Sequence, residues 1–279
     1  MDVLRVTDPV PKQNPINSKL TSGKELHRDA IQCGLICSDL LRKKLLQFST
    51  NVSKRDELKK IVRSLKKQAD QERLAKAQND YGYMLATGSG LKKHYKMARE
   101  YFERKEAKSL PEALYNYGYM EENGLRGSKK NQAETKEPKL REACRLYRLA
   151  ADQGLPEARN NLGRMYELGL GVGRDDREAC NWFEKALDQK GLPEAQFNLG
   201  RMYELGFGVG QDHAEACKWY RKAADQGHTR AQCNLGVMYK DGCGNAIEQS
   251  KVKARYWYHK AAEQGDRSAW EALRAMNAW

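Results

Sequence analysis

Apolar residues recur at helical spacing along most of the chain, in pairs of stripes separated by glycine. In one stretch the first stripe consists of Ala158, Leu162, Met165 and Tyr166, and Gly169 follows at its end. The second stripe consists of Ala179, Trp182, Phe183, Ala186 and Leu187. Both stripes keep the i, i+3, i+4, i+7 spacing of an amphipathic helix, and glycine commonly ends a helix because it adopts the left-handed conformation at no steric cost. The pattern predicts two helices joined by a short turn.

This two-helix pattern occurs five times. Each unit opens with an alanine, at Ala77, Ala113, Ala158, Ala195 and Ala231, in steps of 36, 45, 37 and 36 residues. A glycine, here called the repeat glycine, stands five residues later, at Gly82, Gly118, Gly163, Gly200 and Gly236. A second glycine comes six residues after that, at Gly88, Gly124, Gly169, Gly206 and Gly242. One helix pair cannot bury its own apolar face, so neighbouring pairs must stack. The sequence therefore predicts an all-α solenoid of stacked antiparallel helix pairs.

The motif within the units carries a family resemblance. The pattern A-x-x-x-L-G-x-x-Y-x-x-G-x-G-V, followed by A-x-x-W-Y-x-K-A-A-x-Q-G, is strongest around AEACKWYRKAADQGHTRAQCNLGVMYKDGCG, residues 214–244. It resembles the Sel1-like repeat, a relative of the tetratricopeptide repeat, over about residues 69–268. The first two units depart from the pattern, because Leu85 and Glu121 replace the tyrosine. The resemblance implies a right-handed superhelix that acts as a non-catalytic scaffold or adaptor. Small catalytic activities suggested for some members of the wider family leave an enzymatic role open.

The segments outside the repeats are assigned by the same patterns. The five units are predicted to span residues 77–112, 113–157, 158–194, 195–230 and 231–268. A capping helix is expected over 269–279, and a basic helical hairpin that caps the other end over 23–76. The hairpin consists of one helix over 24–48 and a second with Leu58, Ile61, Val62, Leu65 and Ala69 on one stripe. Residues 1–22 are expected to be disordered, and the polar insertion over 126–139 to be a loop, either for docking or as filler.

The glycine-rich tails GLGVGRDD and GFGVGQDH raise an alternative, because Gly169, Gly171 and Gly173 have the spacing of a dinucleotide-binding loop. Such a loop needs its glycines between a strand and a helix, where backbone amides meet a pyrophosphate. Here the glycines follow a predicted helix, and no segment has a strand pattern. The tails are therefore predicted to be turns.

Composition narrows the class of protein further. The mean hydropathy is -0.87, and no apolar run approaches the 18 or so residues that cross a bilayer. The start has no apolar signal segment, so a soluble, cytoplasmic protein is expected. Cys144, Cys180 and Cys217 recur in EAC contexts, which favours packing over a disulfide or chemical role. The five histidines lie in no metal-ligand spacing, so no metal, no cofactor and no catalytic residue is predicted.

A binding groove is expected along the first helices of the units. Two residues before the repeat glycine stand Asn116, Asn161, Asn198 and Asn234. In the related tetratricopeptide modules an asparagine at this place holds the backbone of an extended peptide. The four asparagines therefore either contact a protein or peptide partner or tie adjacent helices together. Arg164, Glu167, Arg201 and Glu204 follow at helical spacing, and the arginines are expected to attract carboxylates of the partner. Trp219, on a second helix, is expected to fill a gap between layers.

The net charge of +13 belongs mainly to the N-terminal quarter, where residues 1–76 hold 17 Lys and Arg against 9 Asp and Glu. The basic residues are Arg42, Lys43, Lys44, Lys59, Lys60, Arg63, Lys66 and Lys67. They offer an alternative function, in which this segment binds nucleic acid or an anionic membrane surface and the repeats serve as a spacer. A solvated or protein-binding face is the competing interpretation, since no aromatic residue is interleaved to stack on bases.

Overall fold

The computed structural model describes residues 35–48, 55–125, 136–187, 191–242 and 247–277. The predicted disordered segment 1–22 lies outside the described residues, as do residues 23–34 of the N-terminal hairpin, 126–135 of the insertion and the last two residues. In the described parts every element is helical. The elements are α2 (Asp39–Phe48), α3 (Arg55–Asp70), α4 (Ala75–Thr87), α5 (Tyr95–Phe102), the 3-10 turn η2 (Ala107–Ser109), α6 (Pro111–Glu122), α7 (Lys136–Asp152), α8 (Pro156–Leu168), α9 (Asp176–Lys185), α10 (Pro193–Leu205), α11 (His213–Asp225), α12 (Thr229–Asp241), α13 (Lys251–Glu263) and α14 (Arg267–Asn277).

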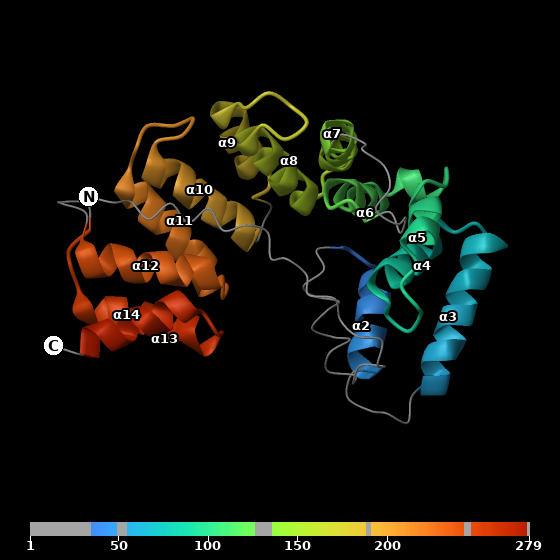
Figure 1. Ribbon diagram of the computed structural model, residues 1–279, viewed down its shortest axis with the longest axis horizontal. Coiled ribbons are helices and arrows are strands. Elements are labelled where there is room, and N and C mark those ends of the chain that lie inside the picture. Colours follow the sequence, from blue (N-terminus) through green and yellow to red (C-terminus); the bar gives the residue numbers. More distant parts are fainter. Residues whose placement is uncertain (1–34, 49–54, 126–135, 188–190, 243–246, 278–279) are drawn as a thin grey trace.

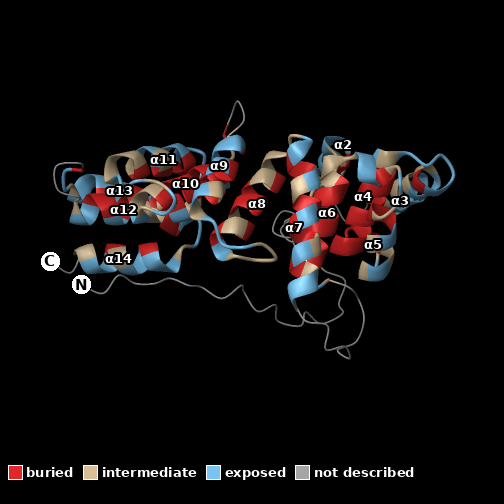
Figure 2. Cartoon of the chain, turned by 90° about the horizontal axis from the view of Figure 1, so that it is seen from above, coloured by how far each residue is buried: buried red, intermediate tan, exposed pale blue. Residues whose placement is uncertain are grey.

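These helices stack in chain order into an arch that runs from α3 at one end to α14 at the other (Figure 1). Each first helix (α4, α6, α8, α10 and α12) packs against the second helix that follows it, and each second helix packs against the next unit. Figure 2 shows the buried residues gathered on the faces where neighbouring helices meet. The predicted all-α solenoid of stacked helix pairs is confirmed.

Local sequence explains where these helices begin. Proline occupies the first turn of α6, α8 and α10, where its missing N–H leaves no hydrogen bond unmade. Several of the second helices begin after a side chain that accepts a backbone N–H of the first turn, such as Asp175 before α9, Asp212 before α11 and Ser250 before α13. Such caps satisfy the otherwise unpaired amides of the first turn.

The repeat glycine allows the two helices of a unit to approach. A Cβ atom built on Gly163 would lie 2.7 Å from the ring of Phe183, and one on Gly200 would lie 2.6 Å from the ring of Tyr220. The rings themselves are fully buried. The glycine in the first helix and the aromatic residue in the second are therefore one packing device, repeated along the stack.

The glycine-rich tails are turns, as predicted. Gly169 and Gly206 end α8 and α10 in the left-handed conformation. The next glycine of each tail packs on the backbone of the preceding unit: a Cβ atom on Gly171 would lie 2.3 Å from the carbonyl carbon of Leu140, and one on Gly208 would lie 2.2 Å from the carbonyl oxygen of Asp176. The tails therefore join successive units.

The N-terminal segment differs from the prediction. Residues 35–38 are not helical, and α2 begins only at Asp39, so one continuous helix over 24–48 is wrong for this part. The apolar stripe of α3 packs into the core as expected. However, α2 lies on the inner side of the arch, with α4 between it and α3, rather than beside α3 in a hairpin (Figure 1). The physical reason is that Ser38 bonds to α4 and also accepts the N–H of Leu41 through its hydroxyl, which starts the helix there.

Candidate functional site

The inner surface of the arch carries the asparagines that precede the repeat glycines. Asn116, Asn161 and Asn198 are buried and Asn234 is half-buried, and they lie on α6, α8, α10 and α12 respectively. The hydrogen-bond partners of these asparagines differ from unit to unit: one bonds to the chain's own backbone, and others line a pocket.

Asn116 holds a segment of the chain's own backbone. Its side-chain oxygen accepts the N–H of Ile36 at 2.6 Å, and its side-chain nitrogen donates to the carbonyl of the same residue at 2.6 Å. The nitrogen also donates to the side-chain oxygen of Asn79 at 2.9 Å, and Asn79 in turn donates to the Ile36 carbonyl at 3.3 Å. Two asparagines from α4 and α6 therefore clamp both polar groups of one residue in a non-helical segment.

Asp80 fixes the same segment two residues further on. Its carboxylate accepts the backbone N–H of Ser38 at 2.7 Å and also the Ser38 hydroxyl. Burial raises the pKa of Asp80, while the hydrogen bonds from Ser38 act to lower it. Residues 36–38 thus run from α6 to α4, opposite to the order of the units.

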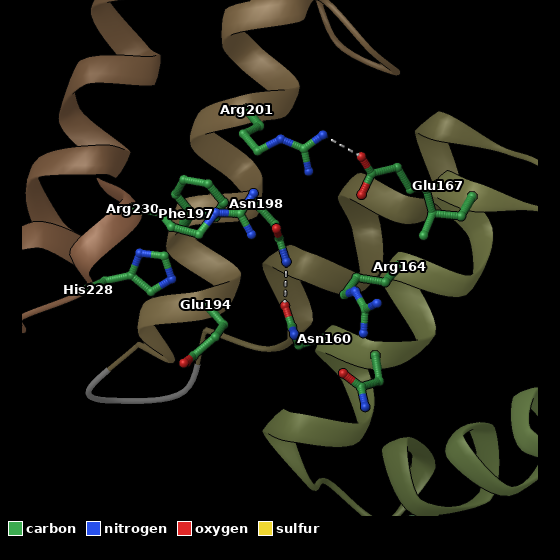
Figure 3. Close-up of a pocket in the computed structure, with 11 residues that line it drawn as sticks. Asn160, Arg164, Glu167, Glu194, Phe197, Asn198, Arg201, His228 and Arg230 are labelled. Atoms are coloured by element: carbon green, nitrogen blue, oxygen red, sulfur yellow. Dashed lines mark hydrogen bonds and ion pairs between the residues drawn. The ribbon is translucent and has the colours of Figure 1, made fainter. Parts of the chain in front are cut away.

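A second asparagine pair of the same form joins α8 and α10. The side-chain nitrogen of Asn198 donates to the side-chain oxygen of Asn160 at 2.9 Å (Figure 3). Both residues line a pocket of about 310 Å³ formed by α8, α10 and the start of α12, here called the concave pocket. Within the described residues, this is the only hydrogen bond of the Asn198 side chain, which leaves its carbonyl oxygen available.

The predicted arginines also line the concave pocket, but they have partners inside the protein. Arg201 pairs with the buried Glu167 at 3.0 Å (Figure 3). Arg164 lies 3.9 Å from Glu122 of the preceding unit. Each pair links one first helix to the one before it. These residues therefore tie repeats together, and their contact with a partner stays a prediction. Glu204 accepts the hydroxyl of Tyr220 at 2.5 Å and does not line the pocket.

The far wall of the pocket consists of residues that the sequence analysis missed. The ring of His228 stacks on that of Phe197 at 4.7 Å, and the guanidinium of Arg230 lies 4.8 Å from the Phe197 centroid (Figure 3). Burial lowers the pKa of His228. Asn160 was missed too, although a signal existed: like Asn79, it stands three residues before a repeat glycine. The stacking around Phe197 joins two units and has no local sequence signal.

The other two predicted asparagines lack this pairing. The residue that corresponds to Asn160 is Tyr115 in the preceding unit and Phe197 in the following one. Asn161 consequently donates to the hydroxyl of Tyr115 at 3.4 Å instead of to an amide. The described structure therefore contains two asparagine pairs, one that holds residues 36–38 and one in the concave pocket.

The basic residues fall into two groups. Arg42 and Lys43 on α2 are exposed and Lys44 is half-buried, whereas Lys59, Lys60, Arg63, Lys66 and Lys67 form an exposed face of α3. Because α2 and α3 lie on different sides of α4, the two groups do not form the single hairpin surface that was predicted (Figure 1).

Among the described residues no three His, Cys, Asp or Glu side chains come together as metal ligands. Cys144 and Cys180 are buried, and burial raises the pKa of the Cys180 thiol to about 11, which suits a packing role. Of the helices that the structure describes, none is both long enough and apolar enough to cross a membrane.

Known proteins share this architecture. The Sel1 repeat matches residues 75–104, 111–155, 156–190, 193–228 and 229–266. A Sel1 repeat protein from Oxalobacter formigenes is 30% identical, with a TM-score of 0.68 over 82% of this chain and 91% of that one. A protective antigen of uropathogenic Escherichia coli strains, which displays an SLR fold, is also 30% identical, with a TM-score of 0.62 over 74% of this chain. The match spans 41% of that antigen's length. No curated protein matches the chain.

Proposed function

This chain belongs to the Sel1 repeat family, and on that premise we propose that it is a scaffold or adaptor that binds an extended segment of a partner protein in the concave pocket. Members of the family are commonly non-catalytic protein-interaction scaffolds. The partner-binding residues are proposed to be those of α8 and α10 together with the start of α12.

One observation carries this proposal: the inner surface of the arch already holds a non-helical segment, residues 36–38 of the same chain, whose main chain bonds to Asn116 and Asn79. Main-chain recognition by side-chain amides requires no particular sequence in the ligand, because every non-proline residue offers one N–H and one C=O. The concave pocket contains the same pair of amides and is open.

Peptide selection followed by exchange mapping tests the proposal. A library of random twelve-residue peptides is selected on the immobilised full chain, and the bound peptides are examined by hydrogen exchange with mass spectrometry. We expect slower exchange in α8, α10 and the first turn of α12, with α9 and α11 unchanged. Protection confined to the outer helices, or failure to select any peptide, would refute a groove-binding scaffold.

The exposed basic face of α3 supports the second candidate function, binding to a polyanion. That face is expected to bind duplex DNA, RNA or anionic vesicles with an affinity that falls steeply with salt concentration. Replacing Lys60, Arg63 and Lys67 by glutamine should remove such binding, and the absence of any binding at low salt would eliminate it as a function.

A further inference from the structure

We infer that Asn198 and Asn160 form a second main-chain clamp, and that it takes an extended peptide with an acidic side chain two residues after the clamped residue. This inference rests on the proposed function, because it specifies the ligand of the same pocket.

The two asparagine pairs are equivalent in their sequence positions and in their bond to each other. Asn79 and Asn160 stand three residues before a repeat glycine, and Asn116 and Asn198 stand two residues before the next one. In both pairs the later asparagine donates to the earlier one at 2.9 Å. Because the two pairs share this bond, the side-chain amide of Asn198 has the same orientation as that of Asn116.

The side-chain amide of Asn198 has free hydrogen-bonding capacity within the described part of the chain. Asn116 uses its oxygen for the Ile36 N–H and a second nitrogen-bound hydrogen for the Ile36 carbonyl. In the described structure the Asn198 oxygen and the second hydrogen of its nitrogen have no such partner. Asn198 is only 7% exposed and lines the pocket. A bound backbone would complete the hydrogen bonding of this amide, as Ile36 does for Asn116.

The direction of the ligand follows from the direction of residues 36–38. The clamped Ile36 lies at α6, and Ser38, two residues later, lies at Asp80 of α4. By the same register, a peptide clamped by Asn198 on α10 runs toward α8, and its second following residue meets Asn161, the counterpart of Asp80.

The side chains around Asn161 decide which residue the ligand carries two positions after the clamped one. The carboxylate of Asp80 accepts from Ser38 and would repel an acid. The counterpart Asn161 is neutral, and Arg164, three residues further along the same helix face, replaces Tyr83. The side chain of Arg164 is 41% exposed, and its ion-pair distance to Glu122 is 3.9 Å, so its guanidinium can still reach a ligand carboxylate.

Two labelled peptides test the inference against the full chain. One has the sequence of residues 35–40, LICSDL, and the other carries the Ser38→Asp change. Fluorescence anisotropy is expected to show about tenfold tighter binding of the acidic peptide, as a charge-assisted hydrogen bond provides. Arg164→Gln should remove this preference, whereas Arg177→Gln, on the exposed surface of α9, should keep it.

The clamp itself is tested by Asn198→Ala, which should weaken both peptides about tenfold or more. If that variant unfolds, Asn198→Asp keeps the size but loses the donors, and the same weakening is expected. Equal binding of the two peptides, no binding of either, or dependence on Asn116 instead of Asn198 would overturn the inference. Peptides from the random library that still protect α8 and α10 would then show that the proposed function survives without this clamp.

Discussion

The side chain of Asn116 hydrogen-bonds to both main-chain polar groups of Ile36, at 2.6 Å each, although the two residues are 80 positions apart in the chain. Asn116 itself is fully buried, whereas Ile36 is half-buried. The first prediction concerns the removal of these bonds. Asn116→Ala should release residues 35–41 and lower the free energy of unfolding by about 2–3 kcal/mol, the sum of the lost bonds and the polar groups left unpaired.

Hydrogen exchange of the peptide that spans residues 35–41 measures this release, and chemical denaturation measures the energy. Asn161→Ala is the matched control, because Asn161 occupies the same place one unit later, where it donates to the hydroxyl of Tyr115 at 3.4 Å and holds no segment of backbone among the described residues. Unchanged protection of residues 35–41 in Asn116→Ala would show that the clamp does not hold the segment.

A second prediction contrasts two glycines of one tail. Gly208→Ala should destabilise by about 2 kcal/mol or more, because φ is +69° and the added Cβ would meet the Asp176 backbone at 2.2 Å. Gly210→Ala should change stability by less than about 0.5 kcal/mol, since nothing lies within 4 Å of its Cβ. Urea denaturation of both variants decides; equal losses would mean that the close approach to α9 is unimportant.

The third prediction concerns the ion pair between Arg201 and Glu167. Arg201 is 31% exposed and pairs with Glu167, which is 8% exposed. After allowance for solvent screening, Arg201→Gln should cost about 1 kcal/mol and Arg201→Glu about 2 kcal/mol. The melting temperature should be highest for the wild type, lower for Arg201→Gln and lowest for Arg201→Glu. The difference between the two variants should become smaller in 1 M salt. A reversal variant as stable as the wild type would argue that the pair is not formed.

The fourth prediction is a pH dependence at the start of α12. His228 accepts the N–H of Ala231 through its ring nitrogen Nδ1, and burial lowers its pKa below 6.5, with Arg230 lowering and Glu194 raising it. The unfolded chain therefore takes up the proton first. The contribution of His228 is complete above pH 6.5 and is lost as the pH falls from there through the lower folded pKa.

His228→Asn keeps a capping oxygen without this titration. The free energy of unfolding is measured in urea from pH 7.5 to 5 for both proteins. As the pH is lowered, that of the wild type should decrease relative to that of the variant. A difference that does not change with pH would rule out His228 as the titrating group.

A fifth prediction concerns cysteine accessibility. Cys180 is 3% exposed, its thiol lies 3.4 Å from the Phe207 carbonyl, and burial raises its pKa to about 11. Because the thiolate is the reactive form, iodoacetamide at pH 8 should leave Cys180 unmodified until the protein unfolds. Cys217, half-buried at the same place one unit later, should react before Cys180 does. Prompt labelling of Cys180 in the native protein would contradict its packing role.

Sequence periodicity was sufficient for the repeating parts of the fold. Ala179 and Phe183 were assigned to one apolar stripe, and both are fully buried against the paired helix that carries Gly163. Periodicity could not decide between adjacent aromatic residues. Trp219 was expected to fill the gap, yet it is half-buried beside Lys222, and the next residue, Tyr220, is the fully buried one. A stripe gives the face of a helix but not which of two neighbours points most directly inward.

The site was harder to predict because its bonds join distant units. Ile36 lies within a run of apolar residues that also suits a helix, yet it is not helical, and its backbone bonds to Asn116 instead. Asn160 matters through its partner 38 residues later, and His228 through the ring of Phe197. Spacing within one helix carries no information about such pairs.

The attachment of residues 36–38 to both α4 and α6 also bears on how the stack comes apart. In a linear array each unit touches only its neighbours, so melting normally begins at either end and spreads. Here a segment braces two successive units and closes a long stretch of chain, which makes that end a single cooperative block. The described residues show no comparable brace across α13 and α14. Under force or mild denaturant the array should therefore unravel from its C-terminal end, with the N-terminal block the last to yield.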